Sequence, residues 1–252
     1  MTEEVAEKVV LVTGAGAGIG RATAELFGAR GAKVVVADLS MSAGQDVVRL
    51  IRERGGEASF VTCDVSDEGA VKASVAHAVK TFGRLDYGVN NAGIDPEVTM
   101  EAEWRLDHFE SIMSVNVRGV FLCMKEEIAQ MLAQGGGSIV NIGSFASYAG
   151  VRNKPAYSAS KHAVLGITRA GSLQYASRNI RINAVCPGGV QTAILEENLK
   201  HIPDIEMVIA SNPIGRIAQP AEIAEAVLWL CSSKASFVVG HGMLVDGGLA
   251  AQ

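Results

Sequence analysis

Ser144, Tyr157 and Lys161 are the residues of this chain whose types and spacing suit them to moving a proton. Tyr157 and Lys161 stand four positions apart in PAYSASKHAVLGITRA, a stretch with helical periodicity, so both side chains project from one helix face. A phenol has a pKa of about 10 in water, and a neighbouring ammonium stabilises the phenolate and lowers that pKa. We therefore expect Tyr157 to act as an acid/base whose pKa is lowered by Lys161.

Ser144 follows an apolar run over 138–142, at the end where ligands bind in open parallel sheets. When a hydride leaves a carbon, the attached oxygen develops negative charge, which a fixed hydroxyl donor stabilises. Ser144 suits this role, although a serine in such a place also commonly caps a helix. The Tyr-x-x-x-Lys spacing alone fits an ordinary helix surface equally well, so the assignment depends on the motifs that accompany it.

A glycine-rich turn lies near the start of the chain, after a run over 8–13 (KVVLVT) that is typical of a buried parallel strand. Gly14, Gly18 and Gly20 follow, and then a stretch of helical pattern. The commoner dinucleotide spacing, Gly-x-Gly-x-x-Gly, would instead place a glycine at Ile19. Glycines let the backbone approach a pyrophosphate, whose charge is stabilised at a helix N-terminus. The order strand, turn, helix therefore predicts a dinucleotide site.

A second apolar run, over 33–37, ends in Asp38, about 20 residues beyond the turn, where a carboxylate can accept hydrogen bonds from the adenosine ribose. A carboxylate repels a 2′-phosphate, and the nearby positions hold no arginine or lysine but Ala15, Ala17, Leu39 and Ser40. We expect NAD as the cofactor in preference to NADP. Without the glycine turn, Asp38 would be interpreted as a helix N-cap or a loop charge.

Together with motifs along nearly the whole chain, these features resemble the short-chain dehydrogenase/reductase family in its single-domain form. The matching motifs are TGAGAGIG over 13–20, CDV over 63–65, NNAG over 90–93, Asn116 in SVNVRG, Ser144 followed by Tyr157 and Lys161, and PGGV over 187–190 with Thr192. The resemblance implies an oxidoreductase that interconverts a secondary alcohol and its ketone by hydride transfer with a nicotinamide cofactor.

The resemblance also implies a catalytic set of Asn116, Ser144, Tyr157 and Lys161. Ser144 would hold the substrate oxygen, and Tyr157 would take the hydroxyl proton. Lys161 would bond the nicotinamide ribose and tune the tyrosine. Asn116 would complete a water-linked proton relay, although it could instead kink its helix.

The implied cofactor site extends over several segments. Asp64 would bond the adenine amino group, and Val190 with Thr192 would contact the nicotinamide carboxamide. Asn91 would lie along the adenosine side, or simply stabilise the turn after its strand. The full expected set is Gly14, Gly18, Ile19, Gly20, Asp38, Leu39, Asp64, Val65, Asn91, Ala92, Gly93, Tyr157, Lys161, Pro187, Gly188, Val190 and Thr192.

The elements that must position these residues follow from strand-like runs near 9–13, 33–37, 58–62, 85–90, 138–142, 180–185 and 242–245, which alternate with helical stretches. This pattern predicts an α/β fold, a Rossmann-like doubly wound, seven-stranded parallel sheet flanked by helices on both faces. With 252 residues, 48% of them hydrophobic, and no linker or repeat, we expect one NAD(P)-binding domain over 1–252 with a substrate lid at about 190–215.

Substrate specificity is expected to reside in loops. The expected substrate-binding residues are Ser144, Phe145, Tyr157 and Gly189, with Asp95, Pro96 and 151–153 as further wall positions. Apolar residues alternate with charges over 193–214, as in a helical flap over a hydrophobic substrate, although an amphipathic helix packed on its own core fits this pattern equally well. We hypothesise an apolar or cyclic secondary alcohol.

Composition limits the kinds of partner and the cellular compartment that we expect for this protein. The formal net charge is -5 and no cluster of lysine and arginine stands out, which disfavours nucleic acid and anionic membranes as partners. The acidic start and the short first apolar run indicate neither a signal peptide nor a membrane span, so we expect a cytoplasmic protein. Cys63, Cys123, Cys186 and Cys231 are expected to be free thiols, and the histidines lack metal-ligand spacing, so no metal is expected.

The expected partners are a small-molecule alcohol or ketone and sister subunits. The resemblance implies a homotetramer in which the long helices containing Asn116 and Tyr157 pair, and the C-terminal strand adds a second interface. Two other functions stay open. One is a 3-oxoacyl thioester reductase of the same fold, which Asp38 disfavours because that activity would prefer NADPH. The other is a non-catalytic NAD-sensing regulatory protein, disfavoured because Ser144, Tyr157 and Lys161 are all present.

Overall fold

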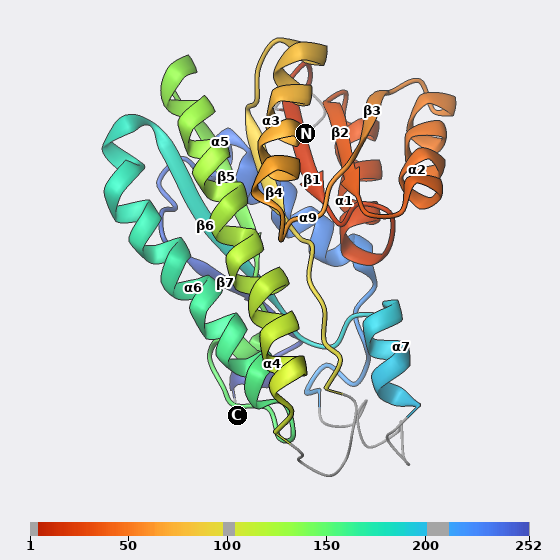
Figure 1. The fold of residues 1–252 in the computed structure, drawn as a ribbon, viewed down its shortest axis with the longest axis vertical. Coiled ribbons are helices and arrows are strands. Elements are labelled where there is room, and N and C mark those ends of the chain that lie inside the picture. Colours follow the sequence, from red (N-terminus) through yellow and green to blue (C-terminus); the bar gives the residue numbers. More distant parts are fainter. Residues whose placement is uncertain (1–4, 98–103, 201–211, 252) are drawn as a thin grey trace.

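A computed structural model describes residues 5–97, 104–200 and 212–251 (Figure 1). Within them, seven parallel strands form one sheet in the order β3-β2-β1-β4-β5-β6-β7, as the sequence predicted. The strands are β1 (Val9–Thr13), β2 (Lys33–Asp38), β3 (Glu57–Thr62), β4 (Tyr87–Asn90), β5 (Gly137–Ile142), β6 (Ile180–Pro187) and β7 (Gly242–Val245). The α-helices are α1 (Gly18–Ala29), α2 (Met41–Glu53), α3 (Glu68–Phe82), α4 (Leu106–Ile112), α5 (Val120–Gln134), α6 (Pro155–Tyr175), α7 (Ala193–Leu199) and α9 (Pro220–Cys231).

Two apolar cores lie on the two faces of the sheet, because side chains alternate along a strand. Val10 and Val12 of β1 pack with residues of α1, α2 and α9. Val9 and Leu11 of the same strand pack with residues of α3, α5 and α6. In Figure 1, α3, α5 and α6 cross in front of the sheet, while α9 lies behind it. Both faces are covered by helices, which explains why the strands read as continuous apolar runs.

The winding of the chain reverses between β1 and β4, which are neighbours in the sheet. Strands β2 and β3 extend from β1 to one side, and β5, β6 and β7 extend from β4 to the other. In folds of this kind, ligands bind in the crevice beyond the carboxyl ends of two such strands, so this edge of the sheet is the expected site. The glycine turn follows β1, and the segment 91–97 follows β4.

Helix α4 continues into α5 through a π-helical segment, Met113–Gly119, which contains Asn116. A π-helical turn carries an extra residue and changes the direction of the side chains along a helix, and such turns are frequent at functional sites. The sequence left open whether Asn116 disturbs its helix, and a distortion is present there.

A buried polar cluster of Asn90, Glu127, Asn141 and Thr168 ties β4 and β5 to α5 and α6. Asn90 Nδ2 donates to Glu127 Oε2 at 3.0 Å and to Asn141 Oδ1 at 2.9 Å, and Asn141 Nδ2 donates to Thr168 Oγ1 at 2.9 Å. Two acceptors of this cluster, Asn90 Oδ1 and Glu127 Oε1, have no partner among the described residues. Burial raises the pKa of Glu127 to about 7. Protonation gives Glu127 a hydroxyl donor in a buried cluster that has an excess of acceptors.

The four cysteines are buried and free, as the sequence predicted. No helix in the described part of the chain combines the length and the apolar character needed to span a bilayer. The lid predicted at about 190–215 is described only in part. Helix α7 and residues 212–215 belong to the described residues, whereas 201–211 lie outside them.

Candidate active site

Helix α6 carries Tyr157 and Lys161 one turn apart. Pro155 occupies its first turn, where the missing N–H of a proline costs no hydrogen bond. The Lys161 ammonium lies 5.6 Å from the centroid of the Tyr157 ring. Both side chains therefore lie on the same face of the helix and can act on one bound molecule.

Lys161 is held below the site by two hydrogen bonds that connect α6 with the end of β5. Its ammonium donates to the carbonyl oxygen of Ile142 at 2.9 Å, and its own carbonyl accepts from Ser147 Oγ at 2.8 Å. The residue is buried, and this burial lowers the pKa of the Lys161 ammonium to about 8. At neutral pH the ammonium is still mostly protonated, so it contributes a positive charge beside Tyr157.

Ser144 stands directly after β5 and caps a short 3-10 helix, Phe145–Ser147. Its Oγ accepts from Ala146 N at 3.1 Å, and its backbone N–H donates to Ser147 Oγ at 3.2 Å. Ser144 also forms a hydrogen bond with Tyr157 that favours the phenolate. The helix-capping role and the site role considered for this serine are thus compatible, because one hydroxyl can accept one hydrogen bond and donate another.

Burial raises the pKa of Tyr157 to about 12, although the hydrogen bond with Ser144 acts in the opposite direction. The carboxylate of Asp95 adds to the increase. The sequence-based expectation that Lys161 lowers this pKa below its usual value is therefore wrong for this structure. The loss of solvent around the phenolate outweighs the charge of an ammonium that bonds Ile142. At neutral pH the phenol is protonated, the form that can donate a proton to a ketone oxygen.

The side chain of Asn116 is buried and forms hydrogen bonds with both the backbone N–H and the backbone carbonyl of Ile94. Asn116 Oδ1 accepts from Ile94 N at 2.8 Å, and Asn116 Nδ2 donates to Ile94 O at 2.9 Å and to Ser160 Oγ at 3.2 Å. Ser160 Oγ in turn donates to the carbonyl of Tyr157 at 2.7 Å. Asn116 therefore connects the segment after β4 with the helix of the catalytic tyrosine, and its part in a proton relay stays a prediction.

The glycine turn has a backbone geometry that leaves no room for larger residues. Gly14 and Gly18 have φ of 61° and 54°, in the left-handed region that favours glycine. A Cβ added to Gly20 would lie 2.2 Å from Gly14 O and 2.4 Å from Asn91 Nδ2. Asn91 Nδ2 donates to the carbonyls of Thr13 and Gly14 at 2.9 and 3.0 Å, so Asn91 braces this turn.

Asp38 ends β2 beside the same turn. Its Oδ2 accepts from Gly16 N at 2.7 Å, and its Oδ1 accepts from Ser40 N at 2.8 Å. One hydrogen bond to each oxygen fixes the carboxylate and leaves lone pairs on both for a further donor. Asp64, at the end of β3, is held by Ser66, whose hydrogen bonds lower the pKa of the Asp64 carboxyl. Both carboxylates are therefore negatively charged groups of defined orientation.

Comparison with known proteins identifies the family. Residues 14–250 match a family model described as enoyl-(acyl carrier protein) reductase. The chain is 43% identical over 250 residues to 2,5-dichloro-2,5-cyclohexadiene-1,4-diol dehydrogenase of Sphingobium indicum, covering 98% of this chain and 99% of the relative. It is 42% identical over 247 residues to cyclohexanol dehydrogenase of Acinetobacter sp., covering 98% and 96%. A crystal structure of levodione reductase, 36% identical, matches with a TM-score of 0.93 over 98% of each chain.

The chain belongs to the short-chain dehydrogenase/reductase family. It is an oxidoreductase that acts on CH–OH donors, and members of this family use NAD(P). The resemblance drawn from the motifs is thus confirmed.

The observed residues fit a bound dinucleotide at the crevice. The glycine turn presents backbone N–H groups at the start of α1, where a pyrophosphate is stabilised. A Cβ added to Gly18 would contact Thr192 Cγ2 at 3.2 Å, so the segment after β6 meets the glycine turn directly. Thr192 Oγ1 accepts from Leu195 N at 3.4 Å and caps α7. NAD(P) would therefore be held between the residues after β1 and those after β6.

The other residues expected to bind the cofactor are distributed around this crevice. Gly188 lies against the backbone of Asp246, since its added Cβ would be 2.9 Å from Asp246 Cα. Leu39 is exposed beside Asp38, and Val190 pairs with Ala218 in a short bridge. Ile19 lies in the first turn of α1, and the other residues lie at or just beyond the carboxyl ends of β3, β4 and β6: Val65, Ala92, Gly93 and Pro187. Their contacts with the cofactor stay predictions.

The expected substrate-binding residues are less uniform in their surroundings. Phe145 is half-buried in the short helix that follows Ser144. Gly189 faces open space, since a Cβ added there would meet no atom within 4 Å. A side chain at position 189 would therefore extend into free volume instead of displacing its neighbours.

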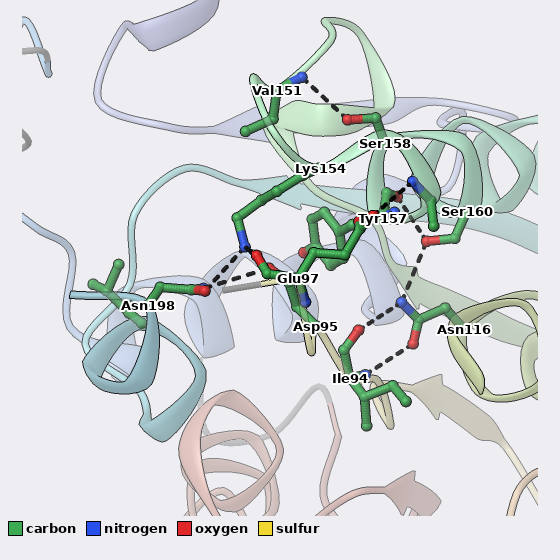
Figure 2. Close-up of polar contacts among 12 residues, drawn as sticks. Ile94, Asp95, Glu97, Asn116, Val151, Lys154, Tyr157, Ser158, Ser160 and Asn198 are labelled. Carbon is green, nitrogen blue, oxygen red and sulfur yellow. Dashed lines mark hydrogen bonds and ion pairs between the residues drawn. The ribbon is translucent and has the colours of Figure 1, made fainter. Parts of the chain in front are cut away.

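The structure also reveals a polar cluster that the sequence did not indicate, which we call the Lys154 cluster: Asp95, Glu97, Lys154 and Asn198 (Figure 2). Of these, Asp95 was expected as a wall residue, and Asn198 falls within the expected lid. The ammonium of Lys154 bonds all three of the others. Asp95 and Glu97 lie in one segment, but Lys154 and Asn198 lie tens of positions from it and from each other, and no motif connects the three parts, so the sequence held no signal for the cluster.

Proposed function

We propose that the chain is an NAD-dependent dehydrogenase that interconverts an apolar or cyclic secondary alcohol and its ketone. The observation that carries the proposal is the convergence of Ser144, Tyr157 and Lys161 at the carboxyl end of β5, in the crevice beside the glycine turn. The relatives named cyclohexanol dehydrogenase and 2,5-dichloro-2,5-cyclohexadiene-1,4-diol dehydrogenase support a cyclic substrate.

In the proposed oxidation, the Tyr157 phenolate accepts the hydroxyl proton of the alcohol while Ser144 Oγ donates a hydrogen bond to the same oxygen. The bound nicotinamide supplies the hydride acceptor. Lys161 contributes a positive charge 5.6 Å from the centroid of the tyrosine ring, which stabilises the phenolate. In the reverse direction, the neutral Tyr157 donates its proton to the oxygen that becomes the hydroxyl.

The preference for NAD over NADP is part of the proposal and rests on Asp38. The carboxylate is fixed by Gly16 N and Ser40 N beside the turn that would hold the adenosine half of the cofactor. A 2′-phosphate at this place would meet a negative charge, whereas two ribose hydroxyls would find free lone pairs. Asp38→Asn should therefore weaken NAD binding and reduce the difference in affinity between NAD and NADP.

The first experiment measures NADH formation, with NADP in parallel, across secondary alcohols from propan-2-ol to cyclohexanol and larger rings. Tyr157→Phe should lower kcat by about a thousandfold or more, because general acid–base catalysis contributes on that order, while NADH still binds. Tyr175→Phe, at the other end of α6, is the matched control and should keep wild-type rates. Substantial turnover by Tyr157→Phe would contradict the assigned acid/base.

The pH dependence of oxidation follows from the raised pKa of Tyr157. Because burial places this pKa at about 12, the phenolate that accepts the proton becomes more abundant as pH rises toward that value. We expect kcat/KM for alcohol oxidation to increase between about pH 7 and about pH 9, and ketone reduction not to increase over the same range. Initial rates in both directions at saturating cofactor would measure this. A flat oxidation profile would mean that the reacting phenol titrates elsewhere.

A 3-oxoacyl thioester reductase remains the second candidate, and the description of the matching family model favours its inclusion in the test. The Asp38 carboxylate argues against it, because that activity was expected to prefer NADPH. Turnover of a 3-oxoacyl thioester with NADPH, faster than that of any cyclic alcohol with NAD, would favour this candidate. Tight NADH binding without turnover of any substrate would instead favour a non-catalytic sensor.

A homotetramer and a single domain over 1–252 are also proposals. Phe121 on α5 and Leu173 on α6 are exposed apolar side chains on the long helices that were expected to pair, and Leu244 of β7 is partly exposed at the other expected interface. Exposed apolar side chains on these elements support association through them. Light scattering that gives the mass of a monomer would defeat the tetramer.

A further inference from the structure

The ammonium of Lys154 is saturated by groups from two other segments (Figure 2). It forms an ion pair with Asp95, donates to Glu97 O at 2.8 Å and donates to Asn198 Oδ1 at 2.9 Å. An ammonium has three donors, so these contacts use its full capacity. The side chains of Lys154 and Asp95 are only 18% and 3% exposed, so water screens this pair much less than a surface pair.

Asn198 connects α7 to this pair through both ends of its amide. Its Oδ1 accepts from Lys154, and its Nδ2 donates to Asp95 Oδ2 at 3.4 Å. Helix α7 begins directly after Thr192, which lies against Gly18 at the glycine turn. The helix is therefore attached at its start to the crevice expected to hold the cofactor and near its end to the Lys154 cluster.

Glu97 fixes the same cluster to the first turn of α6. Lys154, at the N-cap position, provides no side-chain cap for that helix. The Glu97 carboxylate instead accepts from Ala156 N at 3.2 Å and from Tyr157 N at 2.8 Å. Such bonds satisfy N–H groups that have no partner within the helix, and a negative charge is favourable there.

The segment 94–97 is thus held at both ends, with Asp95 between them. Asn116 grips the backbone of Ile94, and α6 binds Glu97. Since Asp95 contributes to the raised pKa of Tyr157, its charge is felt at the reacting phenol. The position of Asp95 relative to Tyr157 is therefore set by contacts on both sides.

We propose that Lys154 is a positioning residue that sets substrate selectivity, because it ties α7 and the segment 94–97 to the helix that carries Tyr157. The proposal rests on the dehydrogenase function above. With the tie in place, α7 keeps one position relative to Tyr157, and a ring bound against both presents its hydroxyl to the phenol. Without the tie, α7 is free to shift, and rings lose their advantage over small alcohols.

The test compares Lys154→Met, which keeps the length of the side chain but removes its charge and donors, with Asn198→Leu and with the double variant. Lys200→Met is the matched control, since Lys200 is exposed at the end of α7 and pairs with Glu197 on that helix. Two quantities are measured: the hydrogen exchange of the α7 amides, with β5 as internal reference, and the preference for cyclohexanol over propan-2-ol, from kcat and KM for each alcohol. Cofactor affinity is measured by NADH fluorescence.

In Lys154→Met we expect the α7 amides to exchange about tenfold faster or more, as loss of hydrogen bonds to a charged group implies. The KM for cyclohexanol should rise about tenfold for the same reason, with a smaller change in kcat. The preference for cyclohexanol over propan-2-ol should fall, while NADH affinity stays within about twofold, because no cofactor contact is removed. Asn198→Leu should show the same changes to a smaller extent, and the double variant should be no worse than Lys154→Met. Lys200→Met should change neither quantity.

Unchanged α7 exchange and an unchanged preference in Lys154→Met would overturn the proposal, as would fully additive effects in the double variant. If Lys154→Met does not fold, Asn198→Leu supports or refutes the tie by the same two quantities. Hydrogen exchange requires no substrate. A wild type that fails to oxidise cyclohexanol would therefore defeat the proposed function, whereas the exchange data would still decide whether Lys154 holds α7.

Discussion

The crevice has two sides that are built in different ways. On the cofactor side, the geometry of the backbone dictates the residues. Gly14 and Gly18 have positive φ, and a Cβ at Gly20 would lie 2.2 Å from a carbonyl oxygen. On the substrate side, Gly189 has free space around it, and the arrangement depends on side chains such as Lys154 and Asn198. A site that backbone defines accepts few residue types, whereas one that side chains define can change its specificity by substitution.

The largest expected effect comes from adding one methyl group on the cofactor side. Gly20→Ala should weaken NADH binding about a hundredfold, since the new Cβ must displace Gly14 O or Asn91, and overpacking of this kind costs about 3 kcal/mol. Ala17→Gly, the opposite change in the same turn, should alter the dissociation constant by only about threefold, because it adds no atoms. Titration of NADH fluorescence measures both. Equal losses of NADH affinity in the two variants would mean that steric room around the glycines does not limit the residue types on the cofactor side.

Glu127 belongs to the buried polar cluster and not to either side of the crevice. Its substitution should therefore change the stability of the protein without changing the geometry of the site. With a pKa of about 7 in the folded protein, against 4.5 for an unperturbed glutamate, the folded state binds its proton more tightly than the unfolded state. The free energy of unfolding should therefore be highest below about pH 4.5 as far as this group is concerned, and decrease by about 3 kcal/mol as pH rises through 7. Glu127→Gln keeps the size of the side chain but cannot ionise, so it should lack this decrease.

Urea unfolding of the wild type and Glu127→Gln from about pH 4.5 to about pH 8 would measure the difference between the two proteins. That difference should shift in favour of the glutamine variant as pH rises, because between about pH 4.5 and about pH 7 the unfolded wild type releases the proton of Glu127 while the folded protein retains it. NADH affinity should stay unchanged, since Glu127 contacts neither side of the crevice. A difference that stays constant with pH would show that Glu127 is already ionised in the folded protein.

The smallest expected effect comes from the equivalent methyl addition on the substrate side. Gly189→Ala should fold normally and bind NADH as the wild type does, because its Cβ meets no atom within 4 Å. The methyl would occupy substrate space, so KM for bulky ring alcohols should rise about threefold to tenfold while KM for propan-2-ol stays the same. A loss of NADH binding as large as that in Gly20→Ala would contradict the distinction between the two sides.

Much of the fold was predictable because its signals are short-ranged. The runs near 9–13 and 242–245 matched β1 and β7 without shift, and the run near 85–90 was longer than β4 by two residues at its start. In this stretch, Asp86 N donates to Val9 O at 2.9 Å, Asp86 O accepts from Ser138 N at 2.9 Å, and the Asp86 carboxylate accepts from Val9 N at 3.0 Å. The backbone hydrogen bonds to the neighbouring strands thus already include Asp86, and strand ends defined by hydrophobic period and by hydrogen bonds differ by about one or two residues.

The candidate site was predictable only where residue type and local spacing carry the chemistry. Four positions along a helix bring Tyr157 and Lys161 to one face, whatever surrounds them. Asn91 and Asn116 were expected from the resemblance, but their side-chain partners, Gly14 O and the backbone of Ile94, became visible only in the structure. Glu97 and Lys154 had no signal, since they act on residues 44 to 60 positions away.

The sequence by itself determined the parallel sheet, the glycine turn and the spacing of the acid/base pair, because periodicity and the sterics of glycine act within a few residues. Only the tertiary structure decided which charges meet and how much water reaches them. Burial raises the pKa of Tyr157, which the sequence predicted to be lowered, and raises the pKa of Glu127 to about 7. The folding of the chain also brings Lys154 into contact with the distant residue Glu97. Solvent exclusion and distances between remote segments arise only when the whole chain is folded, and these quantities set the electrostatics of the site.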